Sequence, residues 1–347
     1  MPLLRPAAAL LIATLCTAVP VMAQPTPVTM ALDWTPNTNH IGLYVAEAKG
    51  FYDEAGLDVQ ILPYSDTSAA TLIANRVADF GVLGSIGLFI QRAAGADLVA
   101  TYALVQTETG RLVFNGDRQD IQSPKDLDGK TYAGFGGAWE DVLLGTMIRD
   151  DGGKGEYETV TLGTSAYEAL YNGAVDFTLE VYTWEGLKAE RDGRGQRAFR
   201  YADFGVPDQH TNFIGTSGAY LAEHPDTATA FIGATQKGYA YAVENPDEAA
   251  DILVAANPEA ALDRDFVRAS LQALIDGHYL RGEDGEVGTI NAAKMEAVGE
   301  FIFRSGILKD GEGKPLTEAP DVSTYYSNEY LATERQNGGV VLERKPG

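Results

Sequence analysis

Asn75-Arg-Val-Ala-Asp-Phe80 is followed, 97 residues further along the chain, by Asn172-Gly-Ala-Val-Asp-Phe177. The expected first strands of the two surrounding units, which contain Ala31 and Thr131, are 100 residues apart, so the order of elements repeats as well. A repeat of this length predicts two similar α/β lobes. A single large doubly wound sheet is the alternative.

Short apolar runs alternate with amphipathic segments in both units, as in a βαβ chain. In the first unit we expect strands over residues 28–32, 57–62, 79–83 and 98–104, helices over 41–55 and 69–75, and a crossover at 111–115. In the second unit we expect strands over 130–134, 157–162 and 175–181 and helices over 139–149 and 167–171. An apolar run at 212–220 then returns the chain to the first lobe, and helical patterns follow at 225–243, 246–256, 264–275 and 291–305.

The N-terminus has the pattern of a secretory signal peptide. Arg5 precedes an apolar run over residues 7–19, and Val21-Met-Ala23 forms a small-residue cleavage site. We therefore expect a signal peptide at 1–23, a discontinuous first lobe with C-terminal helices at 24–115 and 213–336, a second lobe at 116–212 and a flexible tail at 337–347. The hinge is expected near Asn115 and Asn212.

Composition excludes several classes of function. The 347 residues include 49 acidic and 26 basic side chains, and the net charge of −23 would repel nucleic acid and anionic lipid. The single cysteine, Cys16, falls in the expected signal peptide, so the mature chain has none. No later stretch reaches 18 apolar residues, which predicts an exported, soluble, periplasmic protein.

Ligands of open α/β sheets bind beyond the carboxyl ends of the strands. The loops expected there, at 33–40, 63–67, 84–85, 135–140, 163–165 and 180–185, contain Trp34, Trp139 and Trp184, which are all the tryptophans of the chain. They also contain tyrosines, asparagines and carboxylates, but no lysine or arginine. Because anions are usually bound by cationic side chains or helix N-terminal amides, this content favours a neutral or cationic aromatic heterocycle with amino groups.

The same residues also have purely structural interpretations. Trp34 could fill the core, and Glu180, Tyr182 and Trp184 could form one exposed strand face. His40, at the start of a helix, fits a capping role as well as a ligand contact. The one basic run is either a solvated loop or a docking patch: Arg191, Arg194, Arg197 and Arg200.

Enzyme motifs are absent from the sequence. It has no G-x-S-x-G elbow, no phosphate-binding P-loop and no H-E-x-x-H zinc motif. Gly134-Phe-Gly-Gly137 is only a weak relative of the dinucleotide fingerprint, because Trp139 occupies the position of its third glycine. No cofactor, metal site or catalytic residue is predicted.

The segment Ala31-Leu-Asp-Trp34-Thr-Pro-Asn37-Thr-Asn-His40, with Gly42-Leu-Tyr-Val-Ala46 after it, resembles periplasmic binding proteins for thiamine pyrimidine precursors. These proteins belong to the NMT1/THI5-like family, together with the fungal hydroxymethylpyrimidine synthases. The likeness continues at residues 49–52, 56–59, 180–185, 244–250 and 327–331, and so covers most of the mature chain. The resemblance implies a type II periplasmic binding fold that closes on a formylated or hydroxymethylated aminopyrimidine, with Trp34, Asn37, Tyr182 and Glu185 as contacts.

Two departures from the family pattern bear on function. The fungal synthases carry a cysteine-rich iron motif and consume an active-site histidine, whereas this mature chain has no cysteine and reads Gly84-Ser-Ile-Gly87 where that histidine would fall. This speaks against synthase chemistry. The Ser85 region also differs from the pattern expected of the pyrimidine binders, and a flavin-type heterocycle would fit the same aromatic walls.

The sequence therefore predicts a monomeric solute-binding subunit of an ABC importer, which delivers an aminopyrimidine thiamine precursor to a permease and its ATPase subunit. The alternatives are a secreted α/β enzyme acting on a heterocycle and a binder of another heterocycle such as a flavin. The expected ligand-binding residues are Trp34, Asn37, His40, Ser85, Trp139, Tyr182 and Glu185.

Overall fold

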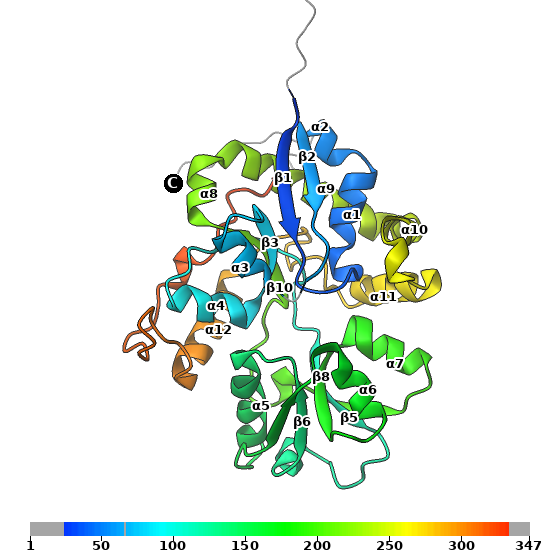
Figure 1. Cartoon of the computed structure of the whole chain (residues 1–347), viewed down its shortest axis with the longest axis vertical. Helices are drawn as coiled ribbons and strands as arrows, with labels where there is room; N and C mark the ends of the chain where they lie inside the picture. The colour runs from blue at the N-terminus through cyan, green and yellow to red at the C-terminus, as the bar shows by residue number, and fades with distance from the viewer. Residues whose placement is uncertain (1–23, 66, 333–347) are drawn as a thin grey trace, which may run out of the picture.

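The computed structural model describes residues 24–65 and 67–332, which form two α/β lobes (Figure 1). The expected signal peptide and C-terminal tail lie outside these residues. Within the described ranges, no helix is both long enough and apolar enough to span a bilayer.

Each lobe is built on its own five-stranded sheet. The first sheet has the order β2 (Leu57–Ile61), β1 (Thr26–Ala31), β3 (Phe80–Gly84), β10 (Asn212–Thr216) and β4 (Val99–Ala103). The second has the order β7 (Glu158–Thr161), β6 (Thr131–Gly134), β8 (Phe177–Val181), β5 (Gly110–Asn115) and β9 (Gln196–Arg200). Two separate sheets confirm the two-lobed α/β prediction and exclude the single doubly wound sheet.

The two sheets exchange one strand each. In the first sheet β10 runs antiparallel to β3 and β4, although it follows the whole second lobe in sequence. In the second sheet β5 runs antiparallel to β8 and β9, although it directly follows the last strand of the first lobe. The chain therefore crosses between the lobes twice, at residues 104–109 and 201–211, and these two segments form the hinge.

The repeated sequence has a structural cause in the first three strands of each lobe. The Asp79 carboxylate accepts a hydrogen bond from the Thr29 backbone N–H at 2.7 Å, and Asp176 accepts one from the Thr131 N–H at 2.8 Å. In each lobe the aspartate before the third strand thus ties that strand to the first one. The repeated sequence therefore corresponds to the same hydrogen bond between the first and third strands of each lobe.

Helices cover both faces of the first sheet. One face packs against α1 (Ile41–Ala48), α9 (Pro225–Glu244), α10 (Pro246–Ala256) and α11 (Arg264–Asp276), and the other against α3 (Ala69–Ala74), α4 (Ser85–Ala93) and α12 (Ala292–Ser305). Two short helices, α2 (Phe51–Glu54) and α8 (Gly218–Glu223), complete this lobe. In the second lobe α5 (Ala138–Asp150) and α6 (Ala166–Tyr171) pack on the sheet, and α7 (Leu187–Arg191) follows the turn after β8.

Three expectations are corrected by these elements. Residues 111–115 are not a crossover but most of β5, because their apolar side chains complete the core of the second sheet; the lobe border and the first hinge segment lie before Gly110, not at Asn115. The helix expected over 41–55 is broken at Gly50, which adopts φ 73° and separates α1 from α2. The arginine run is not a solvated loop throughout, because Arg191 ends α7 and both Arg197 and Arg200 lie on β9.

Candidate functional site

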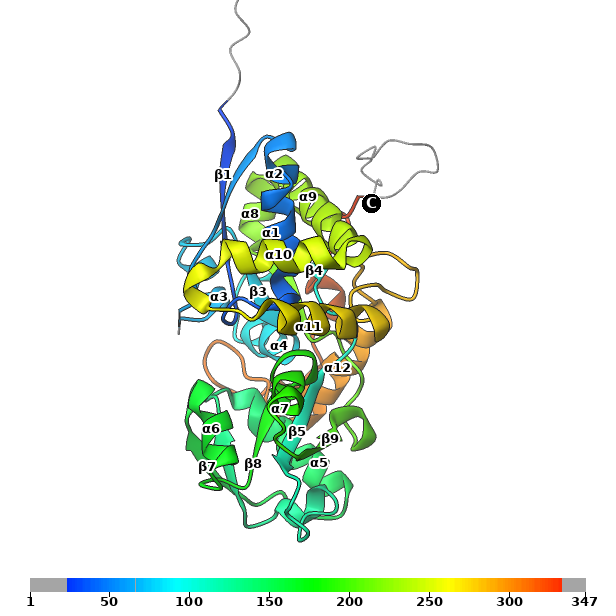
Figure 2. The ribbon, with the colours of Figure 1, turned by 90° about the vertical axis from the view of Figure 1, so that its right-hand side faces the viewer.

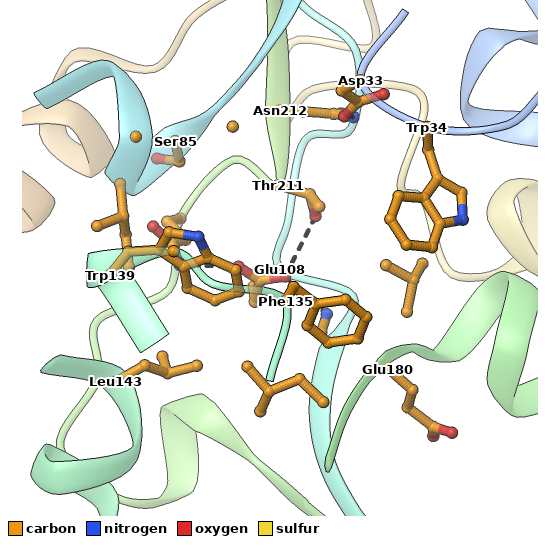
Figure 3. Close-up of a pocket in the computed structure, with 18 of the residues that line it drawn as sticks. Asp33, Trp34, Ser85, Glu108, Phe135, Trp139, Leu143, Glu180, Thr211 and Asn212 are labelled. Atoms are coloured by element: carbon orange, nitrogen blue, oxygen red, sulfur yellow. Dashed lines mark hydrogen bonds between the residues drawn. The ribbon is translucent and has the colours of Figure 1, made fainter. Parts of the chain in front are cut away.

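A cavity of about 570 Å³ lies between the lobes, where the carboxyl ends of β1, β3, β6 and β8 meet. Its walls come from both lobes and from both crossing segments (Figure 3). Four carboxylates line it, Asp33, Glu108, Glu180 and Glu185, and none of its described lining residues is a lysine or arginine. The apolar and aromatic walls include Trp34, Ile86, Ile90, Phe135, Trp139, Leu143, Tyr167, Leu179, Trp184 and Tyr201.

Asp33 and Asn212 form a fixed pair at the end of β1. The Asn212 side-chain N–H donates to Asp33 Oδ2 at 3.2 Å, and His40 Nε2 lies 2.8 Å from Asp33 Oδ1. Burial would raise the pKa of Asp33, but the hydrogen bonds from His40 and Asn212 and the charge of His40 bring it below its ordinary value. Since the amide nitrogen of Asn212 is engaged, its oxygen is left as an acceptor, and this atom is buried with no partner in the described chain.

Glu108 and Gln209 repeat this arrangement where the two crossing segments touch. The Gln209 side-chain N–H donates to Glu108 Oε2 at 2.7 Å, and the Gly110 N–H donates to Glu108 Oε1 at 2.6 Å. Burial raises the pKa of Glu108 to about 7. Gln209 is 4% exposed, and its side-chain oxygen also has no hydrogen-bond partner among residues 24–65 and 67–332.

The other two carboxylates come from the end of β8 and the turn after it. Glu180 is buried against the Arg111 guanidinium, at 2.5 Å, and its pKa is raised by burial in spite of that charge. Glu185 lies on the π-helical turn Tyr182–Gly186, and burial raises its pKa to about 7, opposed by hydrogen bonds from the Val181 N–H and from Trp34. The cavity is thus rich in acceptors, and two of its carboxyls titrate near neutral pH.

The aromatic walls are held by specific contacts. The Trp34 ring lies 5.9 Å from Phe135 in edge-on geometry and 5.9 Å from Tyr64. The loop that presents Phe135 is fixed by the buried Glu140, whose carboxylate accepts hydrogen bonds from the Phe135 and Gly137 N–H groups and the Tyr132 hydroxyl. Phe135 therefore reaches the cavity from a braced loop.

Several contacts join the two lobes on one side of the cavity. Trp184 of the second lobe packs on Phe266 of α11 with ring centroids 4.6 Å apart. On the same side, the Ser270 hydroxyl of α11 donates to the Thr183 carbonyl, and Arg191 of α7 lies 3.4 Å from Asp263. Figure 2 shows α11 directly above α7.

The structure brings five of the seven predicted residues to the cavity: Trp34, Asn37, Ser85, Trp139 and Glu185. The Asn37 side chain is engaged within its own loop, donating to Thr35 and accepting from Asn39. His40 and Tyr182 are not among the described residues that line this cavity. His40 is fully buried behind Asp33, and the Tyr182 ring stacks on Arg111 at 4.1 Å.

The sequence-based prediction missed Glu108, Gln209 and Asn212 as site residues. All three lie in or directly after the crossing segments. The polar residues between β4 and β5 could have indicated site residues. They were not recognised because the first crossing between the lobes was expected at residues 111–115.

Comparison with known proteins identifies the family of this chain. A family model described as NMT1/THI5 like matches residues 37–249. The chain belongs to the NMT1/THI5-like family. It is 30% identical to the formylaminopyrimidine-binding protein of Halalkalibacterium halodurans over 278 residues, which is 78% of this chain and 83% of that protein.

The family contains binding proteins and enzymes. The chain is 26% identical to the 4-amino-5-hydroxymethyl-2-methylpyrimidine phosphate synthase of Legionella pneumophila, over 67% of this chain and 74% of that enzyme. Among solved structures, the periplasmic aliphatic sulphonate binding protein SsuA from Escherichia coli superposes with a TM-score of 0.62 at 16% identity, covering 93% of this chain and 97% of that one. At this identity the likeness shows the two-lobed fold of periplasmic binding proteins and nothing about the ligand.

Proposed function

We propose that this protein is the extracytoplasmic solute-binding subunit of an ABC importer and captures an aminopyrimidine thiamine precursor between its lobes. One observation in the site supports this class of ligand. The side-chain oxygens of Asn212 and Gln209 are buried acceptors without partners in the described residues, because carboxylates hold both amide nitrogens. A ligand with several N–H donors satisfies these oxygens, whereas an anion would face four carboxylates and no cationic side chain.

The aromatic walls complete the recognition. Trp34 and Phe135 approach the cavity from different lobes, so a flat ring held against them is enclosed only when the lobes close. Its amino groups then lie within reach of Glu185 and the amide oxygens. Ligand contacts made only in the closed form shift the lobes toward it, and the hinge segments 104–109 and 201–211 take up the motion.

The site favours binding of the ligand without chemical conversion. The relatives of this chain include a formylaminopyrimidine-binding protein and synthases of a hydroxymethylpyrimidine phosphate. In this chain the position after β3 is Ser85, and the only cysteine is Cys16, far from the cavity in sequence. The protein would hand its ligand unchanged to a membrane permease as a monomer.

Calorimetry tests the ligand class. We expect 4-amino-5-hydroxymethyl-2-methylpyrimidine to bind and an analogue with a methyl group in place of the amino group to bind about tenfold to a hundredfold more weakly, since buried acceptors then stay unpaired. Nitrate, taurine and alkanesulfonates should not bind. Tight sulfonate binding would overturn the proposal, and conversion of the pyrimidine on incubation, detected by mass spectrometry, would favour an enzyme.

A further inference from the structure

The cavity is larger than a single small ring requires. A water molecule occupies about 30 Å³ in the liquid, and this value is an upper bound for a bonded non-hydrogen atom. A substituted pyrimidine of roughly a dozen such atoms therefore occupies at most about 360 Å³. The cavity has about 570 Å³. Space for a second group of about one ring therefore remains.

The cavity also has two chemically different sides. In Figure 3, Trp34, Phe135 and Glu180 lie on one side and Ser85, Trp139 and Leu143 on the other, with Glu108 and Thr211 between them. The side around Trp34 has Asp33, Glu180 and Glu185.

The opposite side is walled mainly by apolar side chains. Ile86 and Ile90 come from α4 of the first lobe, and Trp139 and Leu143 come from α5 of the second. Ile86, Ile90 and Trp139 also pack against one and the same hydrophobic cluster. Helices from both lobes thus form this apolar compartment.

The buried hydroxyl of Ser85 favours a bound group in this compartment. Its side chain is 4% exposed and lines the cavity, and its hydroxyl has no hydrogen-bond partner in the described part of the protein. A buried hydroxyl of this kind costs free energy unless a bound group satisfies it.

We propose that the ligand has two parts: an aminopyrimidine-like ring at the acceptor side, and a second, uncharged and largely apolar group of about one ring's size between α4 and α5, attached through a hydrogen-bonding atom that pairs with the Ser85 hydroxyl. The inference rests on the proposed function for the first part and adds the second. Ile86, Ile90, Trp139 and Leu143 then determine specificity for the extension.

Gly87 offers a selective way to fill the apolar compartment. It lies on α4 and lines the cavity, and a Cβ atom added there would meet nothing closer than the Gln91 side-chain nitrogen at 3.9 Å. Gly87→Leu should therefore fold, helped by the better helix propensity of leucine. Gly195→Leu is the matched control, because Gly195 is exposed, is not a lining residue and also has open space at its Cβ position.

The test compares two neutral ligands by calorimetry: 4-amino-5-hydroxymethyl-2-methylpyrimidine and its benzyl ether. The ether should bind the unaltered protein about tenfold to a hundredfold more tightly, as expected for burying a phenyl ring. Gly87→Leu should abolish this gain and leave the affinity for the alcohol unchanged, while Gly195→Leu should change neither. Ile90→Phe, which narrows the same space one turn later, serves as a second variant if Gly87→Leu melts at a lower temperature.

The outcomes separate this inference from the proposed function. If the alcohol binds and the ether binds no better, or if the gain survives in both cavity variants, the second compartment is wrong and the aminopyrimidine site stands. If neither compound binds, the proposed function fails, and the extension fails with it.

Discussion

Glu185 should make ligand affinity depend on pH around neutrality. Burial raises its pKa from 4.5 to about 7 in the ligand-free protein, so the carboxyl is protonated below pH 7 and ionised above it. A ligand amino group that donates to this carboxylate favours the ionised form. Binding at pH 6 should therefore release a proton, and affinity should be lost as the pH falls through 7.

The size of the effect follows from the two pKa values. If the bound ligand returns the pKa of Glu185 to 4.5, the affinity falls roughly 70-fold between pH 8 and pH 5, or about 2.5 kcal/mol. Glu185→Gln removes the titrating group and keeps the shape of the side chain. The ratio of wild-type to variant affinity should therefore shrink by about this factor over the same pH range.

Calorimetry with 4-amino-5-hydroxymethyl-2-methylpyrimidine at pH 5, 6, 7 and 8 measures this ratio, and buffers of different ionisation enthalpy count the released protons. Protonation of the ligand and of Glu108 is common to both proteins and cancels. Glu190→Gln is the matched control, because Glu190 is an exposed carboxylate on α7 that does not line the cavity. Parallel pH profiles for wild type and Glu185→Gln would refute the assignment of Glu185 as a ligand acceptor.

Three further changes test other parts of the site. Trp34→Ala should weaken binding by about 1–3 kcal/mol and abolish part of the ligand-induced change in tryptophan fluorescence; unchanged affinity with a lower melting temperature would return Trp34 to a packing role. Glu108→Gln should remove a stability loss of about 2.5 kcal/mol between pH 5 and pH 8, measured by urea unfolding of the ligand-free protein, because a carboxyl whose pKa is raised from 4.5 to about 7 destabilises the fold as the pH rises through that range. Glu140→Gln should lower stability by about 1–3 kcal/mol and weaken binding, since one amide oxygen replaces two that accept from three donors; unchanged values for both would show that the Phe135 loop needs no brace.

The two-lobed fold could be predicted because its signals are local or repeated. Apolar runs predicted the strands of both sheets, apart from β5, β9 and β10, to within two residues. The repeated Asp79 and Asp176 make the same hydrogen bond to the first strand of their lobes, so the repeat reflects equivalent structures. The apolar pattern of single segments and the sequence repeat therefore lead to the same prediction of two α/β lobes.

The exchanged strand could not be predicted in this way. An apolar run such as Leu112-Val-Phe114 is equally typical of a crossover and of a buried strand. What decides is its pairing with β8 and β9, which lie more than 60 residues later in the chain. Because the crossing was expected at residues 111–115, Glu108 was assigned to the interior of the first lobe and its contact with Gln209 was missed.

Residue type and loop position identified the walls of the cavity but not the direction of each side chain. His40 was expected at the ligand, yet its ring turns toward Asp33, and Tyr182 turns toward Arg111. In both cases the side chain contacts a charged or hydrogen-bonding partner and does not line the cavity. The position of a residue in a loop therefore does not by itself predict that its side chain faces the cavity.

Hydrogen bonds between side chains also determine which polar atoms the two amides of the cavity present. Asn212 and Gln209 could each present either a donor or an acceptor to a ligand. Asp33, 179 residues away from Asn212, and Glu108, 101 residues away from Gln209, bind the nitrogen of each amide and leave the oxygen to the cavity. The carboxylates thus act twice: they repel anions directly, and they orient two neutral side chains so that these also accept hydrogen bonds. In the proposed function, donor-rich ligands are then favoured by both carboxylates and by both amide oxygens, which a count of acidic residues in the loops would not reveal.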